Sequence, residues 1–281
     1  MGVLVPLDHY SSFRRIALAQ WDAPRDPIIH GHMWLDMTKA DQLLAELSES
    51  HDCKVTYAAL VGKAASLALS EMPAVNAKVI GRKIYRKKTI DVYYQVDIGK
   101  GSDLTGTVVT NTDEKPLHAI ALELSSRAKK IRRGEDRQYE KTQKRGLFRR
   151  APIWLLAYLF RMMSFLLYRV GLPSKLLGAS EPDPFGSVMV TNVGSFGIDV
   201  AYAPLVPWTR TPYIFLVGRA RQMPVVVDGE LVVRKMLPVS ATIDHRVIDG
   251  ALIGRMSQII KRYLENPNDE GTLTVEASEA Y

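Results

Sequence analysis

The sequence alternates between stretches with helical spacing and stretches with strand spacing, and this restricts the chain to an α/β fold. Residues 58–71 are rich in alanine and leucine and end before Pro73, so they predict a helix that Thr56 opens. Residues 91–98 then alternate apolar and more polar side chains, as a half-buried strand does. The length, 281 residues, suits one large α/β domain or two small ones.

Further helices and strands follow from the same spacing rules. Thr38 is a candidate N-cap, with Asp41 at the fourth place of a capping-box pattern. An Asp228-Gly229 turn predicts a hairpin, because this dipeptide suits the left-handed conformations of a tight turn. The remaining predicted elements are helices at 117–131 and 250–264 and strands at 187–193, 213–217, 225–227 and 231–233.

Composition excludes several classes of protein. Hydrophobic residues make up 47% of the chain, which is too many for a disordered protein. Cys53 is the single cysteine, so neither an internal disulfide nor a cluster of thiolate metal ligands can form. The first twenty residues lack the apolar run of a secretory signal. We therefore expect a cytoplasmic protein, and leave open a peripheral association with the membrane.

The positive charge of the chain is concentrated in one block. Between Arg127 and Arg150 there are eleven Lys or Arg against three Asp or Glu, whereas the net charge of the whole chain is +7. Such a block suits anionic lipid, phosphate-bearing ligands or a solvated helix face. Nucleic acid is not expected as a partner, because Tyr139 and Phe148 are the only aromatics in the block and no base-reading module is present.

A strongly apolar stretch follows this block. Residues 153–168 contain only Arg161 and Ser164 as non-apolar side chains, and a helix over 153–170 would be about 27 Å long, just short of a bilayer core of about 30 Å. Helical spacing gathers Ala157, Arg161, Ser164 and Tyr168 on one narrow face. Three interpretations stay open: the helix lies in an anionic membrane surface, packs within an oligomer, or spans a membrane.

Common catalytic and metal motifs are absent from the sequence. We find no phosphate-binding loop, dinucleotide-binding turn or nucleophile elbow. His30, His32 and Asp36 would share one face of a strand, but two histidines in an apolar strand are more often packing residues than metal ligands. No metal is therefore expected.

One short segment has the composition of an active site. His245 and Asp249 lie where a predicted strand meets the last predicted helix, and such junctions expose reactive side chains on a rigid base. A histidine there can accept a proton from a thiol or a hydroxyl near neutral pH. Asp249 before Gly250 is also a good helix N-cap, and His245 could be a hydrogen-bonded core residue. Spacing alone leaves both interpretations open.

Several motifs, in order, resemble one family. Residues 244–250 (DHRVIDG) are similar to the active-site signature of the acyltransferase catalytic domains of 2-oxoacid dehydrogenase complexes, which share a fold with chloramphenicol acetyltransferases. The resemblance extends over most of the chain through FRRIA at 13–17, ALVGKAASLALSEMPAVNA at 59–77, VMVTNVGSFG at 188–197 and DGELVVRKMLPVSATIDHRVIDGA at 228–251.

The resemblance implies both an architecture and a mechanism. The fold would be a mixed sheet with helices packed on it, assembled as a homotrimer with a substrate channel between subunits. His245 would be the general base that deprotonates the thiol of coenzyme A or of a dihydrolipoyl group. Thr191 of the adjacent subunit would donate a hydrogen bond to the oxyanion. Asp249 would hold the histidine loop through an ion pair with Arg14, or failing that with Arg15.

The sequence also departs from the family pattern. No lipoyl attachment site is found, so either a lipoyl group would come from a separate protein or the acceptor is something else. Residues 103–110 and 206–213 differ from the channel-lining motifs of the family, and an insertion occupies about 141–180. We predict one catalytic domain over 1–281, in trimers that the polar end at 273–281 keeps from forming a cage. The alternative is a non-catalytic trimeric scaffold that uses the insertion to hold partners or membrane.

Overall fold

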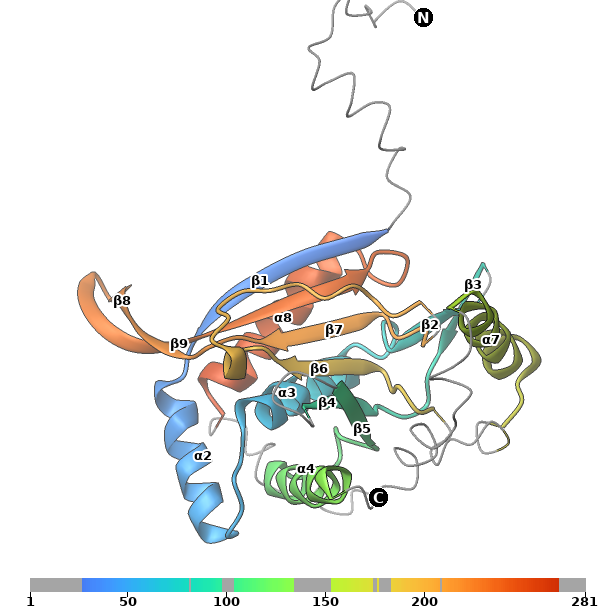
Figure 1. The fold of residues 1–281 in the computed structure, drawn as a ribbon. Helices are drawn as coiled ribbons and strands as arrows, with labels where there is room; N and C mark the ends of the chain where they lie inside the picture. Colours follow the sequence, from blue (N-terminus) through green and yellow to red (C-terminus); the bar gives the residue numbers. More distant parts are fainter. Residues whose placement is uncertain are drawn as a thin grey trace, which may run out of the picture.

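The structure is a computed structural model that describes residues 27–80, 82–97, 104–133, 153–173, 176, 183–207 and 209–267. Its centre is a sheet in which seven strands are described, in the order β1-β9-β7-β6-β4-β5, with β8 paired to β9 (Figure 1). The strands are β1 (Ile28–Asp36), β4 (Val92–Asp97), β5 (Leu104–Val109), β6 (Val188–Asn192), β7 (Tyr213–Val217), β8 (Arg221–Val227) and β9 (Glu230–Asp244). A separate hairpin consists of β2 (Ala77–Ile80) and β3 (Lys83–Arg86).

The main sheet is mixed, as the resemblance implied. Strand β6 pairs in parallel with both β4 and β7, whereas β9 pairs antiparallel with β1, β7 and β8. Strand β7 is buried at all five positions, as expected for a central strand covered on both faces. The α/β prediction is confirmed.

Helices cover this sheet and close the core. The described helices are α2 (Thr38–Ser50), α3 (Tyr57–Glu71), α4 (Leu117–Arg132), α7 (Ile153–Phe165) and α8 (Gly250–Glu265). Helix α3 lies on β4, β6 and β7 with α8 beside it, and every residue from Ala59 to Leu69 is buried (Figure 1). Gly62 makes this approach possible, because a Cβ there would collide with the ring of Tyr94.

Two predicted helix starts are confirmed and one is wrong. The Thr56 side chain accepts a hydrogen bond from the Ala59 amide, and Asp249 caps α8 by accepting one from the Leu252 amide. Thr38 is not an N-cap, because α2 begins at Thr38 itself. The N-cap residue is Met37, and the carboxylate of Asp36 accepts bonds from the Thr38 amide (2.9 Å) and hydroxyl (2.6 Å).

The hairpin at Asp228-Gly229 is also confirmed, but its second strand is much longer than predicted. Strand β9 continues through Pro238 to Asp244, paired with β1 along its second half. The carbonyl of this proline accepts a bond from the Gly218 amide. One continuous strand therefore runs from the hairpin to His245.

The apolar insertion forms α7, which continues as a π-helical turn, η1 (Leu166–Val170). Within the described part of the chain, no helix is both long enough and apolar enough to cross a bilayer.

Candidate active site

The end of β9 presents His245 on a turn held by backbone hydrogen bonds. The amide of His245 donates to the Pro27 carbonyl at 2.7 Å, and the amide of Asp244 donates to the Pro212 carbonyl at 2.9 Å. The Val247 amide then closes the turn on the carbonyl of Asp244 at 3.0 Å. Three segments that are distant in sequence therefore fix where the histidine leaves the sheet.

The imidazole of His245 is exposed and oriented by the backbone. Its Nδ1 lies 3.0 Å from the carbonyl oxygen of Ile248. A carbonyl oxygen only accepts hydrogen bonds, so this contact requires the proton of the neutral ring on Nδ1. The lone pair is then on Nε2, which is the nitrogen that a general base uses.

Asp249 lies four residues further on and begins α8. Its Oδ1 accepts the Leu252 amide at 3.0 Å, so the carboxylate both caps the helix and adds negative charge at the positive end of the helix dipole. Arg14 and Arg15, the predicted partners of Asp249, lie outside the described residues.

Sequence reasoning missed an ion pair that brackets the histidine. The buried carboxylate of Asp244 accepts two hydrogen bonds from the Arg246 guanidinium, from Nε at 2.9 Å and from Nη2 at 2.6 Å, in a bidentate arrangement. The sequence contained a signal for this pair, because an acidic and a basic residue, Asp244 and Arg246, directly flank His245. The pair stiffens the loop that carries the imidazole.

Thr191 lies at the other end of the sheet. It pairs with Leu216 of β7, and Leu216 pairs with Ser240 of β9. His245 is five residues beyond Ser240, which corresponds to about 16 Å along the strand direction. The two side chains therefore cannot share one substrate atom within a single chain.

A glycine turn follows Thr191 and fixes the end of β6. A Cβ on Gly194 would collide with the carbonyl of Gly218, so the turn packs directly on the segment after β7. This close approach explains why glycine follows the strand at this point.

The strand histidines have ordinary hydrogen-bonding partners. His30 Nδ1 lies 3.3 Å from the Thr242 hydroxyl, and His32 Nδ1 lies 2.9 Å from the Tyr202 hydroxyl. Among the described residues, no group of three or more His, Cys, Asp or Glu could hold a metal ion.

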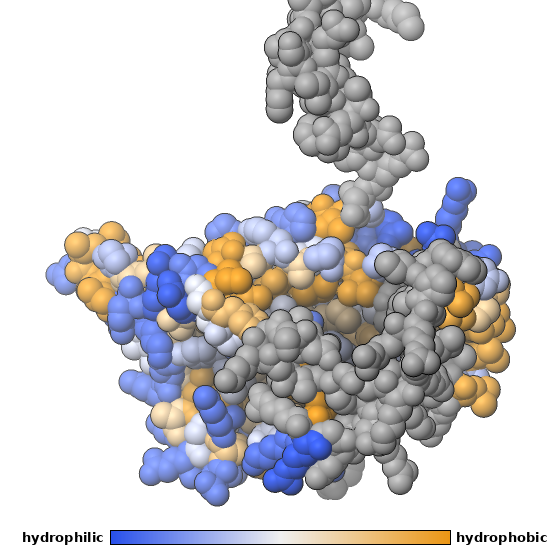
Figure 2. All heavy atoms as spheres, viewed as in Figure 1, coloured by the Kyte–Doolittle hydropathy of each residue, from blue (hydrophilic) through white to orange (hydrophobic). Residues whose placement is uncertain are grey.

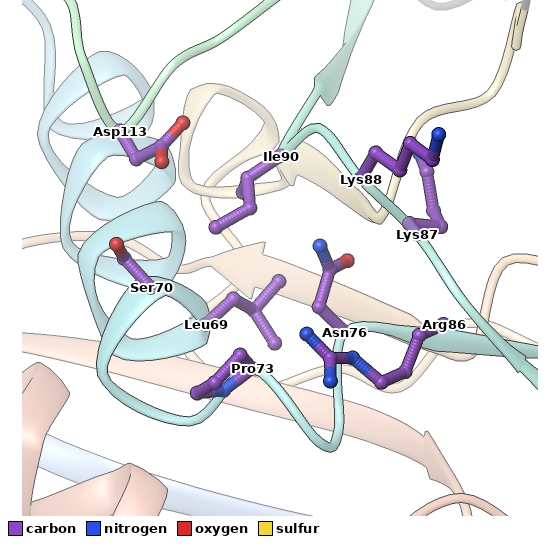
Figure 3. A pocket seen from close by; sticks show the side chains of 9 residues that line it. All are labelled: Leu69, Ser70, Pro73, Asn76, Arg86, Lys87, Lys88, Ile90 and Asp113. Carbon is purple, nitrogen blue, oxygen red and sulfur yellow. The ribbon is translucent and has the colours of Figure 1, made fainter.

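A pocket of about 620 Å³ lies at the C-terminal end of α3 (Figure 3). Three cationic side chains, those of Arg86, Lys87 and Lys88, line it opposite Asp113. None of the residues predicted from the sequence to be catalytic contributes to this pocket.

A sequence model of the 2-oxoacid dehydrogenase acyltransferase catalytic domain matches residues 22–144 and 181–270 of this chain. The chain belongs to this family. The match includes the β9 end with His245 and Asp249, and the β6 end with Thr191. It is interrupted over 145–180, the part of the chain that contains α7 and η1.

Individual family members agree with this assignment. The dihydrolipoyllysine-residue acetyltransferase component of the pyruvate dehydrogenase complex of Mycoplasma capricolum is 27% identical over 237 residues, which are 83% of this chain and 44% of that protein. The chain thus spans less than half the length of this relative.

Solved structures place the fold in the same group. A probable dihydrolipoamide acetyltransferase from Listeria monocytogenes superposes with a TM-score of 0.64 at 22% identity, covering 99% of this chain and 98% of that one. A chloramphenicol acetyltransferase superposes with a TM-score of 0.51 at 13% identity, covering 85% and 89%. The predicted chloramphenicol acetyltransferase-like fold is confirmed.

One departure from the family pattern has a structural explanation in the insertion. In the segment 206–213, the Thr209 carbonyl accepts the Tyr168 hydroxyl at 2.8 Å, and Arg210 Nε lies 3.3 Å from the Ser164 hydroxyl. The altered segment therefore forms hydrogen bonds with residues of the insertion. The other altered segment, 103–110, is only partly described.

Proposed function

We propose that this protein is a CoA-dependent acyltransferase, which moves an acyl group between coenzyme A and a thiol of the dihydrolipoyl type or another acceptor. The observation that carries the proposal is the exposed imidazole of His245, whose Nδ1 is held by the Ile248 carbonyl so that Nε2 is free to act as a base. Membership of the acyltransferase family supports the reaction type.

In this mechanism the imidazole moves one proton. Nε2 removes the proton from the attacking thiol, and the resulting sulfur nucleophile adds to the carbonyl carbon of the thioester. The tetrahedral intermediate collapses with cleavage of the original carbon–sulfur bond, and the departing thiolate takes the proton back from the imidazolium. No covalent acyl-enzyme is required, because both substrates meet at one histidine.

Thr191 stabilises the oxyanion of that intermediate in the proposed mechanism. A single donor of this kind contributes about 2.7–4 kcal/mol to lowering the barrier. The separation of about 16 Å along the sheet means that the hydroxyl must come from a second copy of the chain. We therefore propose a homotrimer, a closed ring in which every interface contains one complete site.

Asp249 has a positioning role in the proposal. Its carboxylate fixes the first turn of α8 directly after the histidine loop. An ion pair with Arg14 would hold the loop from its other side. A separate lipoyl-bearing protein is the proposed source of the acceptor thiol.

A screen of acyl-CoA compounds tests the proposal. Released CoA thiol is measured with dihydrolipoamide and with small hydroxyl compounds as acceptors, for the wild type and for His245→Ala. We expect acceptor-dependent release that the variant lacks. Equal release by both proteins would contradict the mechanism. Absence of release with every acceptor would support the non-catalytic scaffold instead.

A further inference from the structure

The inserted helix is attached to its own chain by its polar side chains. Ser164 is buried and contacts the Arg210 guanidinium, and the Tyr168 hydroxyl donates to the Thr209 carbonyl. The ammonium of Lys78 lies over the Tyr168 ring, 5.0 Å from its centre. Leu159 and Leu166 of the same segment are half-buried, so the attachment combines these polar contacts with partial burial of apolar side chains.

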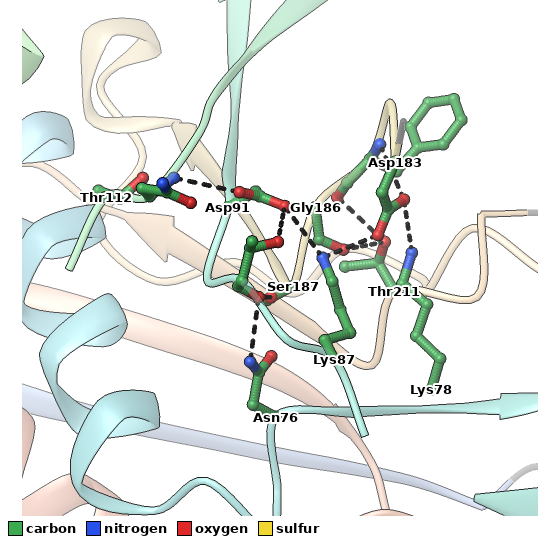
Figure 4. A network of polar contacts seen from close by, with 12 residues as sticks. Asn76, Lys78, Lys87, Asp91, Thr112, Asp183, Gly186, Ser187 and Thr211 are labelled. Carbon is green, nitrogen blue, oxygen red and sulfur yellow. Dashed lines mark hydrogen bonds and ion pairs between the residues drawn. The ribbon is translucent and has the colours of Figure 1, made fainter. Parts of the chain in front are cut away.

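This attachment rests on a buried network of charges (Figure 4). Asp183 accepts Lys78 Nζ at 2.8 Å and Lys87 Nζ at 2.8 Å, and Lys87 also lies 3.5 Å from Asp91. The network connects the β2–β3 hairpin to the segment before β6, directly beneath Tyr168. The orientation of η1 is therefore fixed by partners from several parts of the fold.

Part of the apolar surface of the helix faces solvent. Tyr158, Met162 and Phe165 follow one another at helical spacing and are 61%, 39% and 56% exposed. In Figure 2, apolar residues gather at the edge of the molecule where Figure 1 shows α7. Tyr85 of the hairpin is opposite Lys78 in the strand pairing, so it lies on the face of the hairpin that meets η1, and it is 48% exposed.

Cations flank this apolar side chain cluster. Arg161 and Arg169 are exposed on the helix, and neither forms an ion pair with another described residue. The hairpin sequence RKIYRKK at 82–88 has five cations and no acid, and only Lys87 among them is ion-paired within the described residues. Residues 153–170 also contain no acidic side chain. We call Tyr85, Tyr158, Arg161, Met162, Phe165 and Arg169 the α7 surface.

We propose that the α7 surface binds the surface of an anionic lipid membrane, so that the enzyme is peripherally attached. Aromatic and apolar side chains enter the boundary between headgroups and acyl chains, while unpaired arginines attract anionic headgroups. The charge of the α7 surface favours lipid over a second copy of the chain. A surface with several cations and no acid is complementary to anionic lipid, whereas the same cations on a second copy would repel it. This inference is independent of the catalytic proposal.

Flotation with lipid vesicles tests it on the purified full-length protein. The vesicles are phosphatidylcholine alone, or phosphatidylcholine mixed with phosphatidylglycerol in equal parts. We expect flotation with the mixed vesicles, weaker flotation with phosphatidylcholine alone, and release in high salt. Arg161→Gln with Arg169→Gln should weaken binding to mixed vesicles about fivefold for each charge removed. Phe165→Ser should weaken it about tenfold.

Matched controls change similar residues elsewhere. Leu122→Ser removes an apolar side chain that is 44% exposed on α4, and Lys54→Gln with Lys129→Gln removes two exposed cations without an ion pair among the described residues. Neither control should alter flotation. Light scattering on every variant reports the state of assembly, which should stay unchanged.

Three results would overturn the proposal. The first is a wild type that never floats with mixed vesicles. The second is flotation that the control variants weaken as much as the α7 variants do. The third is a Phe165→Ser protein whose assembly changes while its lipid binding does not, because the α7 surface would then be an interface between copies.

Discussion

Nδ1 of His245 lies 3.0 Å from the carbonyl oxygen of Ile248, a backbone group within the same turn. The ring is therefore oriented by the backbone between β9 and α8, rather than by a neighbouring acidic side chain. Because both ends of this turn are anchored, at Asp244 by the sheet and at Asp249 by the helix cap, Nε2 has a fixed direction. In the proposed mechanism, a base fixed in this way loses little conformational freedom when a thiol arrives.

Replacing the histidine should remove activity and little else. In His245→Ala we expect no detectable acyl transfer, with CoA affinity and thermal stability close to those of the wild type, because the side chain is exposed and makes one described hydrogen bond. CoA release, equilibrium binding and calorimetry measure the three quantities. His51→Ala, which removes an exposed histidine stacked on His118, is the control and should keep full activity.

Two substitutions at Asp249 separate its two roles. Asp249→Ala removes the cap of α8 and should lower the free energy of unfolding by about 0.5–2 kcal/mol. Asp249→Asn keeps a capping oxygen, so its stability should change by only a few tenths of a kcal/mol. Both variants should lose kcat, since both lack the carboxylate charge. Denaturant unfolding beside steady-state kinetics checks this, and a fully active Asp249→Asn would show that the charge has no role.

Asp183 should be a main support of the inserted helix. Asp183→Asn leaves two largely buried ammonium groups, those of Lys78 and Lys87, without this counter-charge. Breaking a buried ion pair on one side costs about 3–5 kcal/mol, and we expect a loss of that order in denaturant unfolding. Asp199→Asn, at an ion pair that is much more exposed, is the control and should cost less than about 1 kcal/mol.

The same carboxylate predicts how stability changes in acid. Burial raises the pKa of Asp183, but the ammonium groups of Lys78 and Lys87 outweigh burial, so the pKa lies below its ordinary value. A carboxylate with a lowered pKa stabilises the fold above its unfolded pKa of about 3.9, and this contribution is lost as the pH falls through the folded pKa. The free energy of unfolding, measured from neutral pH into acid, should therefore decrease less steeply in Asp183→Asn than in the wild type.

Local patterns predicted those parts of the fold that local interactions determine. The caps at Thr56 and Asp249 and the Asp228-Gly229 hairpin depend on residues a few positions apart, and all three are confirmed. Thr38 was assigned wrongly because it is already the first helical residue, and its hydroxyl donates to Asp36 instead of accepting a bond from an amide of the first turn.

Other features depend on residues that are distant in the sequence. Spacing placed Arg161, Ser164 and Tyr168 on one face of the insertion, but only Ser164 and Tyr168 contact the rest of the chain, whereas Arg161 is exposed. The direction of that face was not predicted. The direction is set by Arg210, Thr209 and Lys78, which lie 41 to 90 residues from their partners. The network around Asp183 was missed for the same reason. The separation of Thr191 from His245 likewise follows from strand register, which no local pattern encodes.

Co-assembly of two impaired variants tests most directly whether Thr191 and His245 of different copies form one site. Thr191→Ala alone should lower kcat by about 10²–10³, and His245→Ala alone should be inactive. Co-expressed chains carrying one substitution each should regain activity at about a quarter of the interfaces, where an intact threonine meets an intact histidine. The control co-expresses Thr191→Ala with a chain that carries both substitutions, and its activity should not exceed that of Thr191→Ala. Activity of the mixed assembly no higher than the sum of the two variants alone would contradict the shared site.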